Sequence, residues 1–490
     1  METNKIILTK ENIDSIRQMA SSMSTPFIIY INQVIDMNGT PLSLADGTVY
    51  RFEDGGMIKN TVVNGGIQVE ANGLAQIFDN ATVPDMLNYE VPIEWFGGVC
   101  YTREESIWQT PDYSDQALAD AVVSQRGRKI LFKSGYYFFQ QNVQISHEGI
   151  ILSGTMSYNR IKGIRMDYSS TNDSVSTLAF KAASGVSTFI ETTCNGTRLE
   201  NLLLHEIGQK TKTAVKLSGN AISIFVDRCM FYTWGYGIYK LGSSFSGDNG
   251  LSRCIINECF FYCIKNTAIE ANVGYITYNI IRDSWLSNCG CPIYLKATSQ
   301  LLQDNSIDNC NIDCVKYSAD IYSTYNCCAA IYMESESPNR NYATNSISRC
   351  YFEHVGYDEN VLPPSTCDNT AAIICKNTSV TVENNFFTST PWYFVIDKYS
   401  SLSIKDNSIG ITHSMGNNVP PYDTLIQVKS TSTLTKNIQH SIVYSNSIPI
   451  PPDPGNSFIT KLVNFSGNTG SNFRVKNLFE TRFTDYLPLH

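Results

Sequence analysis

Two acidic residues, Asp308 and Glu353, occupy the same place in a short pattern that recurs along this 490-residue chain. A pair of carboxyl groups can hydrolyse a glycosidic bond when one stays protonated to serve the leaving oxygen and the other activates water or attacks the sugar. If each copy of the pattern forms one rung of a coil of strands, the two residues lie two rungs apart, roughly 10 Å, near the upper limit for an inverting pair. We therefore take Asp308 and Glu353 as candidate catalytic residues.

A second acidic row, formed by Glu258, Asp283 and Asp304, stands just before predicted bends. These residues are candidates for substrate contact, although Asp is frequent in turns and the plainer interpretation is a set of solvated turn residues. A lyase would instead need a base near the sugar carbon that carries the acidic proton, and a cation to neutralise the uronate. The row could hold calcium, but its spacing is not a calcium signature. We expect no metal and no cofactor.

The pattern that defines these positions is aliphatic-x-x-(Asn, Cys or Ser)-x-(Phe, Leu or Ile). An inward aliphatic residue, a bend and a second inward apolar residue are what one coil of a parallel β-helix requires, because strands stack about 4.8 Å apart and like residues pile on like. Asn suits the bend because it tolerates left-handed backbone and its amide can bond to the Asn above and below. The spacing predicts two rungs between Leu302 and Ile347. The copies are Val226/Cys229/Phe231, Ile256/Cys259/Phe261, Ile281/Ser284/Leu286, Leu302/Asn305/Ile307, Ile347/Cys350/Phe352, Val382/Asn385/Phe387, Ile404/Asn407/Ile409, Val443/Asn446/Ile448 and a broken copy, Arg198/Asn201/Leu203.

The alternation of strand side chains then predicts which residues point out of the coil. One outward row is Met230, Phe260, Trp285, Tyr351 and Phe386, and the row two residues further on is Tyr232, Tyr262, Ser287, Asp308, Glu353 and Thr388. Outward aromatic side chains indicate either an interface between subunits or a surface that stacks on sugar rings. The candidates for glycan contact are Tyr232, Tyr262, Trp285 and Tyr351. His205 and His354 are interpreted as bend or core residues that point inward.

Composition excludes several partners. The net charge of −9, without clustered Lys or Arg, argues against nucleic acid and anionic membranes. The start of the chain, "METNKIILTKENIDS", has no apolar core of a signal peptide, and "FIIYI" at 27–31 is too short to span a membrane. We therefore expect neither secretion nor membrane insertion, and synthesis in a cytoplasm. The 15 cysteines match no strong zinc template and are expected to be buried, reduced side chains.

Residues 94–155 contain a distinctive succession: "EWFGG", "YSDQALADAV", "SGYYFF" and "GIILSGT". In the second piece Ser114 can cap a helix, Asp115 favours its positive end, and Ala117, Leu118, Ala121 and Val122 form one apolar face. A short amphipathic helix of this kind can close the exposed end of a solenoid.

This order resembles the start of the pectate-lyase-like superfamily of right-handed parallel β-helices, which includes polysaccharide-degrading enzymes and bacteriophage tail spikes. The family pattern is matched by Phe96-Gly97, Asp115 with Ala117 and Ala121, Gly135-Tyr136 and Gly154; Ser114 stands where the family usually has a first aspartate. The resemblance covers 94–155 and extends loosely to about 450. It implies an all-β, right-handed parallel β-helix with a short capping α-helix and an irregular β segment at the C-terminus.

The resemblance to tail spikes, joined with the absence of an export signal, favours a virion protein of the phage tail made in the host cytoplasm. It implies a homotrimer that binds, and in the enzymes of the family depolymerises, a bacterial surface polysaccharide as a glycoside hydrolase or a lyase. The alternatives are a fibre that only binds glycan and a purely architectural virion protein.

Four segments follow from these patterns. Residues 1–25 form a helical segment that either docks to other phage tail proteins or covers the first strands as a lid. Residues 26–93 form N-terminal β rungs and 94–415 the main β-helix. Residues 416–490 hold the last rungs, a Pro-rich linker at 448–457 and a C-terminal β segment.

Overall fold

A computed structural model provides the structure of the chain. The residues that it describes are 6–22, 27–43, 46–71, 73, 75–101, 111–124, 128–156, 175–242, 250–298, 301–315, 318–336, 344–356, 369–388, 393–398, 400–409, 424–429, 441–444 and 461–466. The chain divides into two compact units, 1–208 and 209–490. The four segments proposed from the sequence stay predictions. Among the described residues, no helix has both the length and the apolar character needed to cross a membrane.

The first unit begins with short parallel strands and a helix. One sheet contains β1 (Ile6–Ile7), β2 (Ile28–Ile31), β5 (Val49–Phe52) and β7 (Gln68–Ala71). Another contains β3 (Val34–Asp36), β4 (Leu42–Ser43), β6 (Met57–Asn64) and β8 (Phe78–Thr82). A short 3-10 helix, η1 (Lys10–Asn12), leads into α1 (Ile13–Ser22), which buries Ile13 and Ile16.

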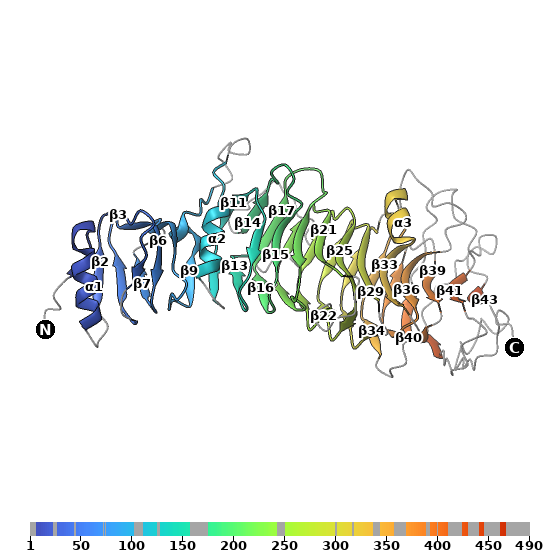
Figure 1. Cartoon of the computed structure of the whole chain (residues 1–490). Coiled ribbons are helices and arrows are strands. Elements are labelled where there is room, and N and C mark those ends of the chain that lie inside the picture. The colour runs from blue at the N-terminus through green and yellow to red at the C-terminus, as the bar shows by residue number, and fades with distance from the viewer. Residues whose placement is uncertain are drawn as a thin grey trace. The chain divides into compact units, whose positions relative to one another are not determined.

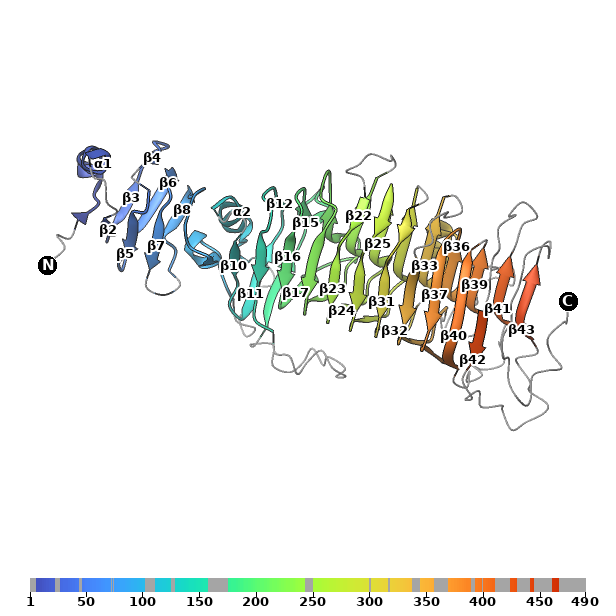
Figure 2. The same cartoon turned by 90° about the horizontal axis from the view of Figure 1, so that it is seen from below.

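The capping helix predicted from the sequence is α2 (Asp115–Ser124), which also belongs to the first unit (Figure 2). It lies beside the 3-10 helix η2 (Ile93–Phe96). Its predicted apolar face is buried. The Asp115 carboxylate accepts hydrogen bonds from the backbone N–H groups of Gln140 and Gln141, and Ser114 Oγ accepts one from Val99 N–H. Both polar side chains therefore tie the helix start to other segments. The strands that follow β8 in this unit are β9 (Glu90–Pro92), β10 (Lys129–Leu131), β11 (Gly135–Phe139), β12 (Val143–Ile145), β13 (Ile151–Ser153), β14 (Ser176–Phe180), β15 (Thr188–Thr192), β16 (Thr197–Glu200) and β17 (Leu202–Glu206).

Two glycines of the motif at 94–155 stand where the backbone conformation or the lack of space favours glycine. Gly97 ends η2 with φ 92°, in the left-handed region. A Cβ at Gly154 would lie 2.6 Å from both Asn201 O and the Ser176 side chain. No larger residue fits there without moving backbone.

The second unit is a parallel β-helix whose rungs place equivalent strands side by side (Figures 1 and 2). We name its sheets E, F, G and H. Sheet E contains β19 (Ile224–Asp227), β23 (Ile255–Asn257), β27 (Ile280–Arg282), β31 (Ser306–Asp308), β34 (Asn345–Ser348), β37 (Ser379–Glu383), β40 (Ser401–Ile409) and β42 (Ser441–Tyr444). Sheet F contains β20 (Met230–Tyr232), β24 (Phe260–Tyr262), β28 (Trp285–Ser287), β32 (Asn311–Asp313), β35 (Tyr351–Glu353), β38 (Phe386–Thr388) and the end of β40.

Of the four sheets in the second unit, sheet G has the most strands and sheet H the fewest. Sheet G contains β18 (Thr213–Leu217), β21 (Tyr236–Leu241), β25 (Thr267–Val273), β29 (Cys291–Ala297), β33 (Cys328–Ser335), β36 (Thr370–Lys376), β39 (Tyr393–Lys398), β41 (Thr424–Lys429) and β43 (Lys461–Ser466). Sheet H contains β22 (Gly250–Ser252), β26 (Tyr275–Thr277) and β30 (Leu302–Gln303). Helix α3 (Ala319–Tyr325) lies beside β33 and buries Ile321 and Tyr325 (Figure 1).

The core of the second unit stacks like on like, as the repeat predicts. Phe231 lies over Phe261 with ring centroids 4.6 Å apart, and Phe352 over Phe387 at 4.9 Å. Inward asparagines form a ladder in which Asn279 Nδ2 donates to Asn305 Oδ1 and Asn305 Nδ2 to Asn345 Oδ1, each at 2.8 Å. The predicted amide stacking at bends is therefore confirmed.

The left-handed bend lies one residue earlier than the sequence pattern suggests. At the E–F corner, the positive φ values belong to Arg228, Glu258, Asp283, Asn309, Arg349 and Asn384. The Cys, Ser or Asn that follows each of them points inward, where Cys259 N–H donates to Ser284 Oγ at 3.1 Å. The inward residue needs to be small and polar but not left-handed, which explains why Cys and Ser are tolerated there.

One copy of the predicted repeat, Leu302/Asn305/Ile307, does not align with the others in the structure. Ile281 pairs with Ile307, and Ile307 with Ile347, so the matching copy is Ile307/Cys310/Ile312 and the step to Ile347 is a single rung. The additional residues between Ile307 and Ile347 include helix α3. Leu302/Asn305 belongs to a different corner, the one with the asparagine ladder. Downstream, Ile404 pairs with Ile442 rather than Val443, while Asn446, Ile448, the Pro-rich linker and everything after 466 lie outside the described residues.

Candidate functional site

The candidate site is the outer surface of sheet F, which we call the sheet-F face. The middle residue of each of its strands points inward and the two flanking residues point outward. The strand register fixes two outward rows. The first is Met230, Phe260, Trp285, Asn311, Tyr351 and Phe386, and the second is Tyr232, Tyr262, Ser287, Asp313 and Glu353.

Aromatic rings cover the first rungs of this face. Tyr232 stacks on Tyr262 with centroids 5.8 Å apart and planes 6° apart, and Phe260 contacts Trp285 at 5.2 Å. Tyr232, Tyr262 and Trp285 are partly exposed. Phe260 points out of the coil but is only 9% exposed because neighbouring rings cover it. The predicted direction of this row is therefore confirmed, while Phe260 and Met230 are buried.

Acidic side chains occupy the next rungs. Asp313 on β32 pairs in register with Glu353 on β35, so their backbones are neighbours about 4.8 Å apart. The indole Nε1–H of Trp285 donates to Asp313 Oδ2 at 2.6 Å. This bond joins the aromatic part of the face to the acidic part.

The acidic part also contains hydrogen-bond acceptors that no described residue satisfies. Asp313 is 8% exposed, and neither its Oδ1 atom nor Asn311 Oδ1 has a donor within the described part of the chain. Burial, a hydrogen bond to Glu353 and the negative charges of Glu353 and Asp313 raise the pKa of Tyr351 to about 12. Tyr351 therefore keeps its phenolic proton near neutral pH and can donate it to Glu353.

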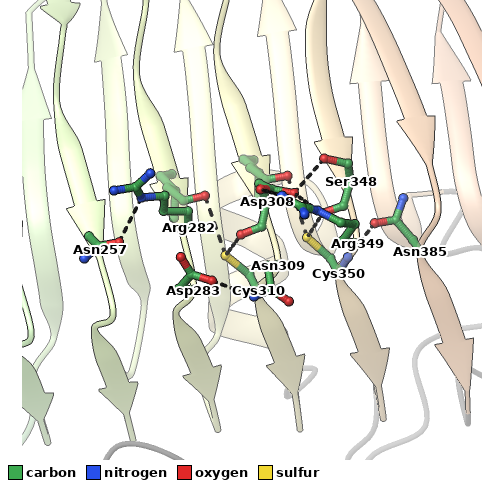
Figure 3. Close-up of polar contacts among 12 residues, drawn as sticks. Asn257, Arg282, Asp283, Asp308, Asn309, Cys310, Ser348, Arg349, Cys350 and Asn385 are labelled. Carbon is green, nitrogen blue, oxygen red and sulfur yellow. Dashed lines mark hydrogen bonds and ion pairs between the residues drawn. The ribbon is translucent and has the colours of Figure 1, made fainter. Parts of the chain in front are cut away.

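Asp308 lies elsewhere, in a polar row on the outer side of sheet E (Figure 3). It accepts hydrogen bonds from Arg349 Nε at 2.8 Å and Ser348 Oγ at 2.9 Å, with a further contact to the second guanidinium nitrogen of Arg349. The hydrogen bond from Arg349 is the largest cause that holds the pKa of Asp308 below its usual value. A carboxylate in this ion pair is ionised and poorly suited to act as an acid.

The predicted pairing of Asp308 with Glu353 is therefore wrong. Asp308 pairs in register with Arg282 and Ser348, whereas Glu353 pairs with Asp313. The error follows from placing Asn305, rather than Cys310, at the E–F corner. That placement puts Asp308 in sheet F, although it belongs to sheet E. Asp313 was missed for this reason. The copy Ile307/Cys310/Ile312 fits the same pattern and would have put Asp313 beside Glu353.

The second acidic row is split between corners. Glu258 and Asp283 share the left-handed position of the E–F corner, and Asp283 Oδ1 accepts a hydrogen bond from Asn309 Nδ2 at 2.5 Å (Figure 3). Asp304, with φ 56°, precedes Asn305 at the other corner, as Tyr278 precedes Asn279. The prediction of one continuous row is therefore wrong for Asp304.

The two histidines are not inward core residues. His354 has φ 51° at the corner that ends sheet F, and its Nδ1 lies 3.6 Å from Glu353 Oε1. In the first unit, His205 pairs in register with Ala179, which pairs with Phe138 in an outward row. Burial lowers the pKa of His205 to about 4. The bend interpretation is correct for His354 and the inward orientation is wrong for both.

Another acidic cluster lies on the outer side of sheet G, where every carboxylate has donors. Glu334 accepts from Tyr332 Oη and Lys376 Nζ, each at 2.6 Å. Glu270 accepts from Thr267 Oγ1 at 2.6 Å and from Tyr325 Oη of α3 at 2.8 Å. The hydrogen bond from Tyr325 ties α3 to the sheet.

No group of three or more His, Cys, Asp or Glu side chains in the described ranges could hold a metal ion. The cysteines of those ranges are free, and most are buried. Burial raises the pKa of the Cys259 and Cys289 thiols. They act as small core residues, as predicted.

The strand register and the rungs define an all-β parallel β-helix. No family model and no curated protein matches the sequence. Among solved structures, the chain is similar to the catalytic unit of a GH87 alpha-1,3-glucanase from Streptomyces thermodiastaticus strain HF3-3, with 10% identity, a TM-score of 0.45, and coverage of 79% of this chain and 68% of that one. It is also similar to the gp42 tailspike of Acinetobacter phage vb_AbaP_AS12, with 12% identity, a TM-score of 0.46, and coverage of 81% of this chain and 67% of that one. A third similar structure is ORF18 of Geobacillus virus E2, with 13% identity, a TM-score of 0.36, and coverage of 79% of this chain and 62% of that one.

Proposed function

We propose that this chain recognises a bacterial surface polysaccharide through the sheet-F face and serves as a tail-spike protein of a bacteriophage. The observation that carries the proposal is the partly exposed Trp285, whose indole N–H is fixed on Asp313 at 2.6 Å. An aromatic ring held in one orientation beside a carboxylate suits a sugar, because a sugar has an apolar face for stacking and hydroxyl groups that donate hydrogen bonds. Tyr232 and Tyr262 extend the stacking surface along the rungs.

Binding is tested by titrating purified protein with capsular or lipopolysaccharide preparations from candidate host strains. We expect saturable binding that Trp285→Ala weakens strongly, while Tyr239→Ala on sheet G leaves it unchanged. Equal binding by the Trp285→Ala protein and the parent protein would remove the sheet-F face from the proposal.

Cleavage is the second step of the proposal, and it falls to Asp313 and Glu353 in place of Asp308. Carboxyl groups on neighbouring strands suit a retaining glycosidase, in which the two groups are about 5 Å apart. One would protonate the leaving oxygen and the other would attack the sugar. New reducing ends would establish hydrolysis, unsaturated uronate would establish lyase chemistry, and binding without either product would leave a fibre that only adheres.

The virion setting, the homotrimer and the attachment of the N-terminal region to other tail proteins belong to the same proposal. They are supported by the motif at 94–155. The competing architectural role is favoured by Phe386, which is 38% exposed and stacks on Tyr351 at 5.4 Å, as expected of a surface buried between subunits. Analytical ultracentrifugation of the parent and Phe386→Ser proteins tests this role: a trimer that dissociates on substitution, with no glycan binding by the parent, would favour it.

A further inference from the structure

The sheet-F face presents hydrogen-bond acceptors and negative charge, and this sets the kind of sugar that it can take. Asp313 Oδ1 and Asn311 Oδ1 are buried acceptors without a donor from the described residues. A buried acceptor left unpaired costs about 1–3 kcal/mol. A ligand that supplies donors at this point recovers that energy.

No positive charge in the two outward rows offsets the carboxylates. None of the eleven described residues of these rows is Lys or Arg. Two arginines at the E–F corner are paired with sheet-E carboxylates: Arg349 with Asp308, and Arg228 with Asp227 at 3.1 Å. On the other side, His354 lies next to Glu353, at 3.6 Å.

We infer that the sheet-F face selects a sugar unit that brings hydrogen-bond donors and no negative charge, with an amino sugar preferred, and that it rejects uronates. The inference rests on the proposed function and narrows its substrate class. A uronate carboxylate would place two more acceptors beside Asp313 and Glu353, where like charges repel. An ammonium or hydroxyl group supplies the missing donor.

The test uses three hexasaccharides that differ in charge: glucosamine, N-acetylglucosamine and galacturonate hexamers at pH 6, followed by saturation-transfer NMR at millimolar concentration. The parent protein should bind glucosamine most tightly, N-acetylglucosamine more weakly and galacturonate not at all. In the Asp313→Asn/Glu353→Gln protein, the advantage of glucosamine over N-acetylglucosamine should fall by about tenfold or more, because two charges within a few ångströms are removed.

A matched control is Glu383→Gln, which removes one negative charge from sheet E outside the face and should leave the order unchanged. Thermal unfolding of each variant checks that it is folded. Galacturonate binding as tight as that of the other hexamers overturns the inference and leaves glycan recognition in place. Binding of none of the three by the parent protein overturns the inference together with the sheet-F face as a sugar surface.

Discussion

The indole N–H of Trp285 donates a hydrogen bond to Oδ2 of Asp313, one rung further along the helix, at 2.6 Å. It is the donor that holds one oxygen of a carboxylate only 8% exposed, so it fixes both the ring and the acid. Removing only this donor, with Trp285→Phe, should lower the free energy of unfolding by about 1–3 kcal/mol, because Asp313 loses a buried partner. Urea unfolding measures the change, and an unchanged midpoint would contradict it.

The ring itself should matter for binding. Trp285→Ala is expected to weaken polysaccharide affinity roughly thirtyfold, about 2 kcal/mol, because a tryptophan at the centre of a contact surface contributes far more than its neighbours. Trp285→Phe should retain most of the affinity because it keeps an aromatic face. Titration calorimetry with the host polysaccharide compares the two, and equal losses would show that the ring does not stack on the ligand.

Asp313 and Asp308 should differ sharply in their effect on cleavage. Asp313→Asn and Glu353→Gln are each expected to slow release of reducing ends by about 10²-fold to 10⁴-fold, as removal of a proton-transfer group does. Asp308→Asn should leave the rate unchanged and cost at most about 1 kcal/mol of stability, because it breaks an ion pair with Arg349, whose side chain is 66% exposed. Reducing-end assays with the three variants distinguish the two acids. Slow cleavage by the Asp308→Asn protein would show that Asp308 takes part in catalysis.

The asparagine ladder should be a main support of the second unit. Asn305 is 2% exposed and bonds to Asn279 on one side and Asn345 on the other. Asn305→Ala removes the acceptor of the backbone and side-chain N–H groups of Asn279 and the side-chain donor to Asn345, so we expect a loss of at least about 3 kcal/mol. Ser346→Ala, on the outer side of the next corner, should change stability by less than about 0.5 kcal/mol. Equal thermal shifts for the two variants would show that the ladder is not important.

His205 makes the first unit sensitive to acid. Its folded pKa, lowered by burial to about 4, lies below the usual value of about 6.5 for an unfolded chain. The stabilisation is present above pH 6.5 and is lost as the pH falls towards 4, since the unfolded chain binds the proton first. Between pH 7 and pH 5 we expect a loss of about 2 kcal/mol from this residue. The His205→Gln protein should lose that much less stability over the same range, as measured by urea unfolding.

The sequence alone determined the fold class, the capping helix and the direction of most side chains. Inward Phe, Leu and Ile residues recur with the same offset in successive rungs, and only a stack of parallel strands buries all of them at once. Outward Trp285, Tyr232 and Tyr262 follow directly from strand alternation.

Only the tertiary structure decided which acids are neighbours. Two corners of the coil, one with Cys259 and Ser284 and the other with Asn279 and Asn305, need the same small polar inward residue, so Leu302/Asn305 and Ile307/Cys310 both fit the repeat. Strand pairing removes the ambiguity because Ile307 lies between Ile281 and Ile347. A local pattern reports what one corner requires, whereas the register between strands depends on packing of the whole rung, and that register places Asp313, not Asp308, beside Glu353.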